Sequence, residues 1–354
     1  MQASPATAEQ DNQVQLPHPK TLLPGDAPSY QTPLGALYQG DCLVWLRKVP
    51  SESINTVFAD PPFNLKKDYG RGVSDAMKED DYLAWSKAWL DECIRVLRPG
   101  GALLVFNLPR WCIDYGHHLG ERGLTFRHWI ACRMPKSMPI FGRMSPSHYG
   151  LLYYSKGKPA TFNIIRQPVQ TCRHCGGEVK DYGGHRNKLH DDGLRLQDVF
   201  DAPEEVWEDA PFALPAGEGW SRVDEIWEDI PPVRHARYKH RDANALAPLM
   251  LERLVAMTTN AGDIVVDPFC GTGTTPYAAE HLGRRWLSAE LGDIQPAIQR
   301  LEDHAAGLHA RWESARGKGR TNGKAAKKAA LARKKRELLA EEAPELPFDA
   351  RVAG

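Results

Sequence analysis

The sequence predicts an α/β fold with a doubly wound, mostly parallel sheet and a small inserted domain. Short apolar runs alternate with segments of helical periodicity, and several runs end in Pro- or Gly-rich turns. The alternation stops after Gly157 and resumes near Pro248, so two separated segments would build the sheet. With 354 residues, 42% of them hydrophobic, the chain can bury one large core and carry a smaller attachment.

The individual elements follow from apolar patterning and from the residues that end each run. The strands expected are residues 36–38, 54–59, 102–106, 124–131, 149–154, 264–266 and 285–289. The helices expected are residues 82–97, 248–258 and 274–282, the first of them ended by Arg98-Pro99-Gly100-Gly101. Strands separated by helices favour parallel neighbours with helices on both faces.

Composition divides the chain into regions. We expect a disordered tail over residues 1–32, which are rich in Pro, Gln, Ala and Thr, and an α/β segment over residues 33–156. Residues 157–233 form a polar insertion rich in Trp and Gly, residues 234–306 a second α/β segment, and residues 307–354 a helical tail rich in Lys and Arg.

Charge and composition also limit where the protein works. The 45 Lys and Arg balance the 45 Asp and Glu, but basic residues gather at 311–336 and acidic residues at 198–229. We expect no membrane span, because no apolar run approaches ~20 residues, and no secretion signal. Seven cysteines in a chain of this length do not resemble a disulfide scaffold, so we expect a cytoplasmic protein.

A glycine turn lies between the strand expected at 264–266 and the helix expected at 274–282. The sequence Asp267-Pro-Phe-Cys-Gly-Thr-Gly-Thr-Thr275 lets the backbone approach a ligand and faces helix N–H groups toward it. Pro276 stands where a dinucleotide fingerprint has its third glycine, and the Gly-Lys-Ser/Thr of a phosphate loop is absent.

Two acidic residues indicate the ligand of this turn. Asp267, at the end of the strand, is placed to hold an amino group, and Glu290, at the end of the next strand, suits the hydroxyls of a ribose. A ligand with an ammonium group, a ribose and little phosphate is S-adenosylmethionine. The alternative is a tight strand-to-helix turn without a ligand.

A second loop, Asp60-Pro61-Pro62-Phe63, follows the buried run at 54–59. Two consecutive prolines make it rigid and extended. Asp60 and the Pro61 carbonyl are then fixed acceptors for the two hydrogens of an exocyclic amine, which favours a tetrahedral nitrogen with a free lone pair. Phe63 offers a ring on which a base flipped out of a duplex can stack. The alternative is a surface turn in which Asp60 caps the next element.

Together the two motifs resemble the amino-methyltransferases of DNA, and their order along the chain resembles the permuted beta class of that family. In that class the Asp-Pro-Pro-aromatic loop precedes the target-recognition region, and the cofactor turn follows it. The resemblance covers about residues 34–160 and 234–300 and implies a Rossmann-like methyltransferase sheet. Residues 33–156 would be the catalytic half, residues 157–233 the target-recognition insertion and residues 234–306 the cofactor-binding half.

The resemblance also implies roles for single residues. Asp267 would bind the methionine amino group, Glu290 the ribose, and the Asp41-Cys42 segment the adenine of S-adenosylmethionine. Leu246–Leu254 matches the segment that flanks the methionine end, although Leu246-Ala247-Pro248 replaces the usual Gln-Lys-Pro. The catalytic residues would be Asp60, Pro61, Pro62 and Phe63. The cofactor-binding residues would be Asp41, Cys42, Asp60, Asp267, Pro268, Phe269, Gly271, Gly273, Thr274, Thr275 and Glu290.

By the same resemblance, Asp60 at the head of the loop favours adenine N6 over cytosine N4 as the acceptor. Carbon-5 methylation is not expected, since no cysteine follows a proline. We therefore expect a site-specific enzyme that flips adenine out of double-stranded DNA and methylates it directly. The alternatives are a cytosine-N4 DNA enzyme, an enzyme for adenine in structured RNA, and a nucleic-acid-binding protein that keeps the fold without catalysis. A second copy of the chain and a cognate restriction endonuclease are candidate partners.

A Cys-His cluster in the insertion has the residue types of a zinc site. Its candidate ligands follow the spacing Cys-x2-Cys-x9-His-x4-His and are Cys172, Cys175, His185 and His190. Four protein ligands would make the metal structural. The alternative is a pair of thiols with unrelated surface histidines. Basic and aromatic residues near this cluster are candidates for DNA contact, and the basic tail could contact the DNA backbone non-specifically.

Overall fold

The computed structural model of the chain describes residues 16–65, 76–133, 148–167, 194–195 and 246–308. The chain divides into two compact units, Met1–Ala306 and Gly307–Gly354, and the helices and strands described here all lie in the first. The main sheet has eight strands in the order β1-β2-β10-β9-β3-β4-β6-β5. A separate pair of short strands, β7 and β8, lies within the insertion.

The strands of the main sheet are β1 (Tyr30–Gln31), β2 (Gly35–Gln39), β3 (Ile54–Ala59), β4 (Leu97–Asn107), β5 (Thr125–Arg133), β6 (His148–Ser155), β9 (Ile264–Asp267) and β10 (Arg285–Glu290). The other pair is β7 (Arg166–Gln167) and β8 (Leu194–Arg195). The helices are η1 (Pro19–Leu22), α1 (Cys42–Leu46), α2 (Glu79–Val96), α3 (Pro109–Glu121), α4 (Pro248–Thr258), α5 (Thr274–His281) and α6 (Gln295–Ala305).

The central strands of the sheet are parallel. Strands β2, β10, β9, β3 and β4 pair in parallel in that order, whereas β1, β6 and β5 join antiparallel at the two sides. The expectation of a mostly parallel, Rossmann-like sheet is confirmed. Because the central strands run in one direction, their carboxyl ends lie along a single edge, which is where such sheets bind ligands.

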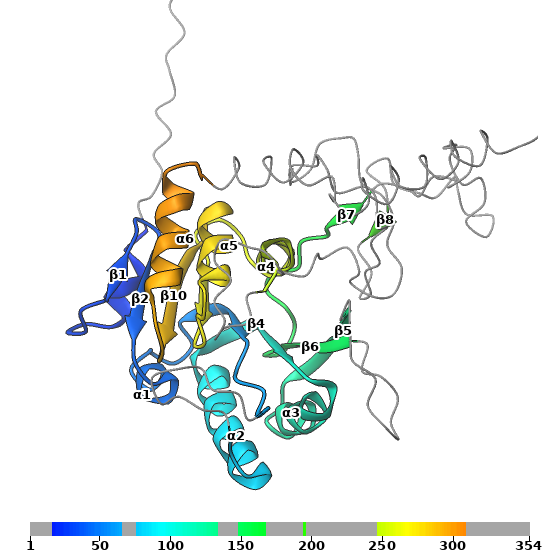
Figure 1. Cartoon of the computed structure of the whole chain (residues 1–354). Helices are drawn as coiled ribbons and strands as arrows, with labels where there is room; N and C mark the ends of the chain where they lie inside the picture. Colours follow the sequence, from blue (N-terminus) through cyan, green and yellow to red (C-terminus); the bar gives the residue numbers. More distant parts are fainter. Residues whose placement is uncertain (1–15, 66–75, 134–147, 168–193, 196–245, 309–354) are drawn as a thin grey trace, which may run out of the picture. The chain divides into compact units, whose positions relative to one another are not determined.

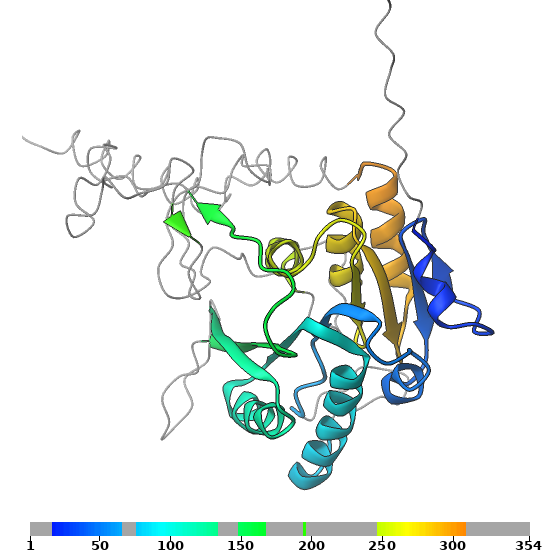
Figure 2. The same ribbon diagram turned by 180° about the vertical axis from the view of Figure 1, so that it is seen from behind.

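Two apolar cores cover the two faces of the sheet. One contains side chains of α1, α2 and α3, with Trp45, Trp89 and Tyr115 among the largest. The other contains side chains of α4, α5 and α6, together with Trp286 of β10. Figures 1 and 2 show these two groups of helices on opposite sides of the sheet. Neighbouring residues along a strand supply opposite cores, which explains the continuous apolar runs in the sequence.

The structure corrects the expectation for the amino-terminal tail. Residues 16–32 are not disordered: η1 and β1 form there, and Leu23 is only 3% exposed. His18 caps η1 by accepting the Lys20 N–H, and Ser29 donates its N–H to the Leu37 carbonyl. Backbone pairing and one buried leucine fasten a segment whose composition carries no periodic signal. Residues 1–15 lie outside the described residues.

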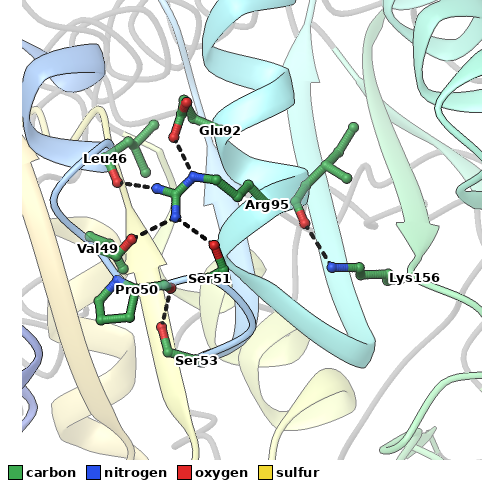
Figure 3. A network of polar contacts seen from close by, with 9 residues as sticks. Leu46, Val49, Pro50, Ser51, Ser53, Glu92, Arg95 and Lys156 are labelled. Atoms are coloured by element: carbon green, nitrogen blue, oxygen red, sulfur yellow. Dashed lines mark hydrogen bonds and ion pairs between the residues drawn. The ribbon is translucent and has the colours of Figure 1, made fainter.

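Arg95 fastens the end of α2 to the loop between α1 and β3 (Figure 3). Its guanidinium donates to the carbonyl oxygens of Leu46 (2.7 Å) and Val49 (2.9 Å) and to the Ser51 hydroxyl (3.0 Å), and it pairs with Glu92. A charged donor makes strong hydrogen bonds, here to the last residue of α1 and to the loop that follows it. This network lies at the amino-terminal edge of the sheet, away from the ligand edge.

The inserted region is described only at its start and at β8. Asn163 attaches its start to the end of α4, because the side chain donates to the carbonyl oxygens of Ala256 and Thr259, both at 2.9 Å. The rest of the insertion, and the basic stretch 311–336, lie outside the described residues. Within the described residues, no helix is long and apolar enough to cross a membrane.

Candidate active site

Four loops meet along the carboxyl edge of the sheet. They follow β2, β10, β9 and β3, which are adjacent in that order, and they begin at Gly40, Leu291, Pro268 and Asp60. Neighbouring strands are about 4.8 Å apart, so one ligand of moderate size can contact all four loops. The structure thus brings together the two motifs that stand more than 200 residues apart in the sequence.

The end of β9 places Asp267 against the glycine turn. The residue is 2% exposed, and its Oδ1 accepts the Phe269 N–H at 2.9 Å. Burial raises the pKa of Asp267 to about 7; the nearby Glu290 also raises it, whereas hydrogen bonds from Thr275 and Phe269 lower it. A buried carboxyl at this position gains most from a bound cation, because a cation removes the cost of its charge.

The glycine turn brings α5 close to α6. Gly271 and Gly273 have φ angles of 53° and 77°, in the left-handed region where a glycine is favoured. A Cβ on Gly273 would lie 2.8 Å from Ala297 of α6, so the close approach also requires glycine. No side chain caps the amino end of α5, so its first N–H groups are available for a ligand.

Arg300 of α6 forms hydrogen bonds with the same turn. Its guanidinium donates to the hydroxyl oxygens of Thr274 (2.5 Å) and Thr272 (3.4 Å), and all three residues are buried. The carbonyl of Leu246 accepts the Thr274 hydroxyl at 3.5 Å, which places the start of α4 beside the turn. Nothing in the sequence of α6 distinguishes Arg300 from an ordinary surface arginine.

Glu290 connects two turns through its carboxylate. One oxygen accepts the Gly271 N–H and the other the Gly292 N–H, both at 2.7 Å. The side chain therefore fixes the glycine turn to the loop that follows β10. Each carboxylate oxygen keeps a further lone pair, so binding of ribose hydroxyls stays a proposal.

The first loop of the edge is built around Asp41. Gly40 donates its N–H to the Glu290 carbonyl at 2.9 Å, so this loop is adjacent to the end of β10. Asp41 caps α1 by accepting the N–H groups of Leu43 (2.9 Å) and Val44 (3.0 Å). The Cys42 side chain is 6% exposed and belongs to the apolar core, so its contact with a ligand also stays a proposal.

Asp60 lies close enough to Asp267 for their charges to interact. Burial and the neighbouring Asp267 carboxyl raise the pKa of Asp60 well above its usual range. The adjacent strands explain this proximity, since Val57 pairs with Val266. Asp60, Asp267 and Glu290 therefore place three carboxyl groups in a partly dehydrated site, where a ligand with positive charge would favour the ionised form of Asp60 and Asp267.

The ring of Phe63 lies in an aromatic cluster. It contacts the rings of Phe106 (centroid distance 6.0 Å) and Tyr149 (5.8 Å), and the residue is only 5% exposed. The open stacking face expected from the sequence is absent in this arrangement. Stacking of a base on Phe63 would require the cluster to open, and it stays a proposal.

Side chains of α2 and α3 form hydrogen bonds with the backbone of the Asp-Pro-Pro-Phe loop. The Tyr82 hydroxyl donates to the Pro62 carbonyl at 2.5 Å, and the Trp111 indole donates to the Phe63 carbonyl at 3.0 Å. Neither residue is recognisable as a loop contact from the sequence: Tyr82 lies in an expected amphipathic helix, and no helix was expected around Trp111. Their role becomes visible once α2 and α3 are packed on the sheet.

The four proposed zinc ligands, Cys172, Cys175, His185 and His190, lie outside the described residues. Among the residues that the structure does describe, no group of three or more His, Cys, Asp or Glu side chains is arranged to hold a metal. The cysteines with described side chains, Cys42, Cys93, Cys112, Cys132 and Cys270, are buried free thiols.

Comparison with known proteins identifies a family. The model of the DNA methylase family N6_N4_Mtase matches residues 54–295. The type II methyltransferase M.BamHI of Bacillus amyloliquefaciens is 45% identical over 277 residues, which are 78% of this chain and 59% of that protein. The DNA adenine methyltransferase YhdJ of Escherichia coli (strain K12) is 27% identical over 314 residues, which are 86% of this chain and 94% of that protein.

A solved structure agrees in fold. The cytosine-N4-specific PvuII DNA methyltransferase superposes with a TM-score of 0.53 at 18% identity, over 82% of this chain and 96% of that one. At this identity the likeness concerns the fold alone. It supports the Rossmann-like architecture that the strand order and the two apolar cores define.

Proposed function

The chain belongs to the N6/N4 family of DNA methylases, and from this premise we propose that it transfers a methyl group from S-adenosylmethionine to an exocyclic amino nitrogen of a base in DNA. The observation that carries the proposal is the meeting of the Asp60 loop and the Asp267 turn on adjacent strands. The finer proposal is adenine N6 in double-stranded DNA, supported by Asp60 and by the likeness to YhdJ. Cytosine N4 is the alternative, because its amine has the same two hydrogens.

The site residues fit S-adenosylmethionine. The loops along the edge, taken from β2 to β3, would contact adenine near Asp41, ribose at Glu290, the methionine ammonium at Asp267 and the acceptor amine at Asp60. When bound, the cofactor supplies a methyl group made electrophilic by a positively charged sulfur. Its two positive centres would lower the cost of ionising the Asp60 and Asp267 carboxyls, whose pKa values are raised in the free protein.

The catalytic contribution of this chain is orientation of the amine. The Asp60 carboxylate and the Pro61 carbonyl accept the two amine hydrogens, which draws the nitrogen toward tetrahedral geometry and releases its lone pair. Pro61 is buried, so its carbonyl acts where water competes weakly. Holding acceptor and donor groups in reacting geometry removes an entropic barrier that a free amine would meet.

The test is methylation of DNA that carries no prior modification. Amplified bacterial genomic DNA is incubated with the protein and S-adenosylmethionine, digested to nucleosides and measured by mass spectrometry. The adenine proposal expects N6-methyladenine; N4-methylcytosine alone would replace it with the alternative. If neither product forms while the protein binds DNA, the chain is a binding protein that keeps the fold.

One variant separates the chemistry from cofactor binding. We expect Asp60→Ala to bind S-adenosylmethionine within a few-fold of the unaltered protein by titration calorimetry and to lose methylation by about a hundredfold or more. Asp26→Asn, which removes a charge from a partly exposed ion pair with Lys48, is the matched control and should methylate normally. Normal turnover by Asp60→Ala would refute the assigned role.

Zinc binding by the insertion and pairing with a second copy or a restriction endonuclease belong to the proposal as well. Four ligands of the types Cys and His would give a closed structural site that stabilises a region with little apolar periodicity. A separate nuclease fits a chain whose relatives include type II methyltransferases. Metal analysis and co-purification test these two points independently of catalysis.

A further inference from the structure

The Asp-Pro-Pro-Phe loop is held at three successive residues after Pro61. Tyr82 donates to the Pro62 carbonyl (2.5 Å), and Trp111 donates to the Phe63 carbonyl (3.0 Å). The third residue, Asn64, has φ 55° and bonds through its side chain to both the carbonyl (3.1 Å) and the N–H (2.9 Å) of Met77. The backbone conformation of the loop therefore depends on α2 and α3, which supply Tyr82 and Trp111.

Tyr82 is the end of a buried hydrogen-bonded network. The Tyr115 hydroxyl donates to the Tyr82 hydroxyl at 2.9 Å, and the Asn107 amide donates to both, at 3.3 and 3.2 Å. Ser86 lies 3.0 Å from the Tyr115 hydroxyl. These four side chains are at most 1% exposed, so water does not compete for their bonds.

The direction of the network follows from counting protons. Tyr115 gives its one hydroxyl proton to Tyr82, so Ser86 must donate to Tyr115. Leu108 donates its N–H to Asn107 Oδ1 at 2.7 Å, which fixes the amide with its nitrogen toward the two tyrosines. The chain of donors therefore runs from Ser86 and Asn107 to Tyr82. The Tyr82 hydroxyl accepts these bonds and donates its own proton to the Pro62 carbonyl.

The backbone of two prolines transmits this constraint to the acceptor. The ring of Pro62 fixes its φ near −65°, so only its ψ angle separates the Pro61 carbonyl from the Pro62 carbonyl. A bond that holds the Pro62 oxygen therefore limits the direction of the Pro61 oxygen to what one backbone rotation allows. The Pro61 carbonyl would accept one hydrogen of the amine. The direction of this carbonyl therefore determines the direction of the lone pair on the amine nitrogen.

The same face of α2 contacts the cofactor turn. Trp85 and Trp89 lie three and seven residues beyond Tyr82, and their rings contact Phe269 at centroid distances of 5.9 and 5.2 Å. One helix face thus touches both the loop that would hold the amine and the turn that would hold the cofactor. We propose that Tyr82 is a positioning residue for methyl transfer, acting through the Pro62 carbonyl to aim the Pro61 acceptor at the cofactor side.

The inference rests on the proposed function, and its test starts from the methylation rate of the unaltered protein. Tyr82→Phe keeps the ring and removes only the hydroxyl. The matched control is Tyr154→Phe, which also loses a buried tyrosine bond to a carbonyl, that of Gly116 at 3.1 Å, at a site that touches neither loop. Tyr115→Phe weakens the network but leaves the Tyr82 bond to Pro62 in place.

We expect Tyr82→Phe to lower kcat by about tenfold to a hundredfold, with the affinity for S-adenosylmethionine changed by less than about twofold. Tyr115→Phe should show a smaller loss of the same kind, and Tyr154→Phe none. Hydrogen–deuterium exchange of the free protein supplies a second measurement. The amides of Phe63 and Asn64 should exchange faster in Tyr82→Phe and unchanged in Tyr154→Phe.

The outcomes separate the two claims. Equal kcat values and equal loop exchange for Tyr82→Phe and Tyr154→Phe overturn the positioning role. A kcat loss explained wholly by weaker cofactor binding also overturns it. If Tyr82→Phe does not fold, Tyr115→Phe decides by the same two measurements. If the unaltered protein methylates nothing, the proposed function fails, whereas the exchange rates still report whether Tyr82 holds the loop.

Discussion

Replacing Asp267 by Asn should stabilise the free protein at alkaline pH and abolish cofactor binding. The structure buries this carboxyl at 2% exposure and raises its pKa from an ordinary 3.8 to about 7. Between those pH values the folded chain holds a proton that the unfolded chain has lost. The free energy of unfolding therefore falls as the pH rises from about 4 to about 7. Above about pH 7 both states have lost the proton, and the free energy of unfolding falls no further on account of Asp267.

The size of the effect follows from the pKa shift. A shift of about 3 pH units at about 1.4 kcal/mol per unit corresponds to about 4 kcal/mol of stability at pH 8. An Asn side chain has the same shape and can still accept the Phe269 N–H, but its amide hydrogens need partners that the carboxylate did not. We therefore expect Asp267→Asn to gain about 2 to 4 kcal/mol at pH 8 and about 2.5 kcal/mol less at pH 5, where the unfolded chain has lost the proton that the folded chain keeps.

Thermal unfolding at the two pH values measures this difference. At about 2 to 4 °C per kcal/mol, the Tm of Asp267→Asn should exceed that of the unaltered protein by roughly 4 to 16 °C at pH 8. S-adenosylmethionine should raise the Tm of the unaltered protein and leave that of the variant unchanged. Asp26→Asn should shift Tm little at either pH. A Tm gain that is equal at pH 5 and pH 8, or a Tm loss at pH 8, would contradict the electrostatic reasoning.

Three further predictions concern the turn, the scaffold and the insertion. Gly273→Ala should lower the free energy of unfolding, measured by chemical denaturation, by roughly 2 to 4 kcal/mol and weaken cofactor affinity, because its Cβ would lie 2.8 Å from α6. Gly283→Ala has a similar φ but open space around its Cβ, and it should lower the free energy of unfolding by only about 1 kcal/mol. Arg95→Ala should lower the free energy of unfolding by about 2 to 3 kcal/mol without changing cofactor affinity by calorimetry, because its bonds lie at the far edge of the sheet. Plasma mass spectrometry should find about one zinc per chain, and a Cys172→Ser/Cys175→Ser variant should retain none; metal-free protein in both would reject the site.

The sequence was most informative where local chemistry decides structure. The apolar runs that became β3, β9 and β10 were predicted within a residue or two, because buried parallel strands are apolar on both faces. The Asp-Pro-Pro-Phe loop and the glycine turn were recognisable because proline and glycine impose backbone geometry wherever they occur. The position of Asp267 at a strand end followed directly from these two facts.

Features that depend on packing were not predictable in the same way. Helix α1 has five residues, too few for a periodic pattern, and it forms where Asp41 caps it at the end of β2. The link from Tyr82 to Pro62 depends on how α2 crosses the sheet, and no spacing in the sequence encodes that. The closed ring cluster around Phe63 likewise results from β6, whose Tyr149 reaches the loop through strand pairing.

The order of the two motifs along the chain does not matter to the site, because the sheet edge decides which loops meet. Strand β3 belongs to the first segment and β9 to the second, yet they pair directly. Side chains strengthen this junction at its other end: Asn55 donates to Asp263 and accepts the Ile264 N–H, and the Thr56 hydroxyl donates to the Thr258 carbonyl. The Asp-Pro-Pro-Phe loop and the glycine turn are therefore held in register by one strand pair, although the insertion separates their two segments in the sequence.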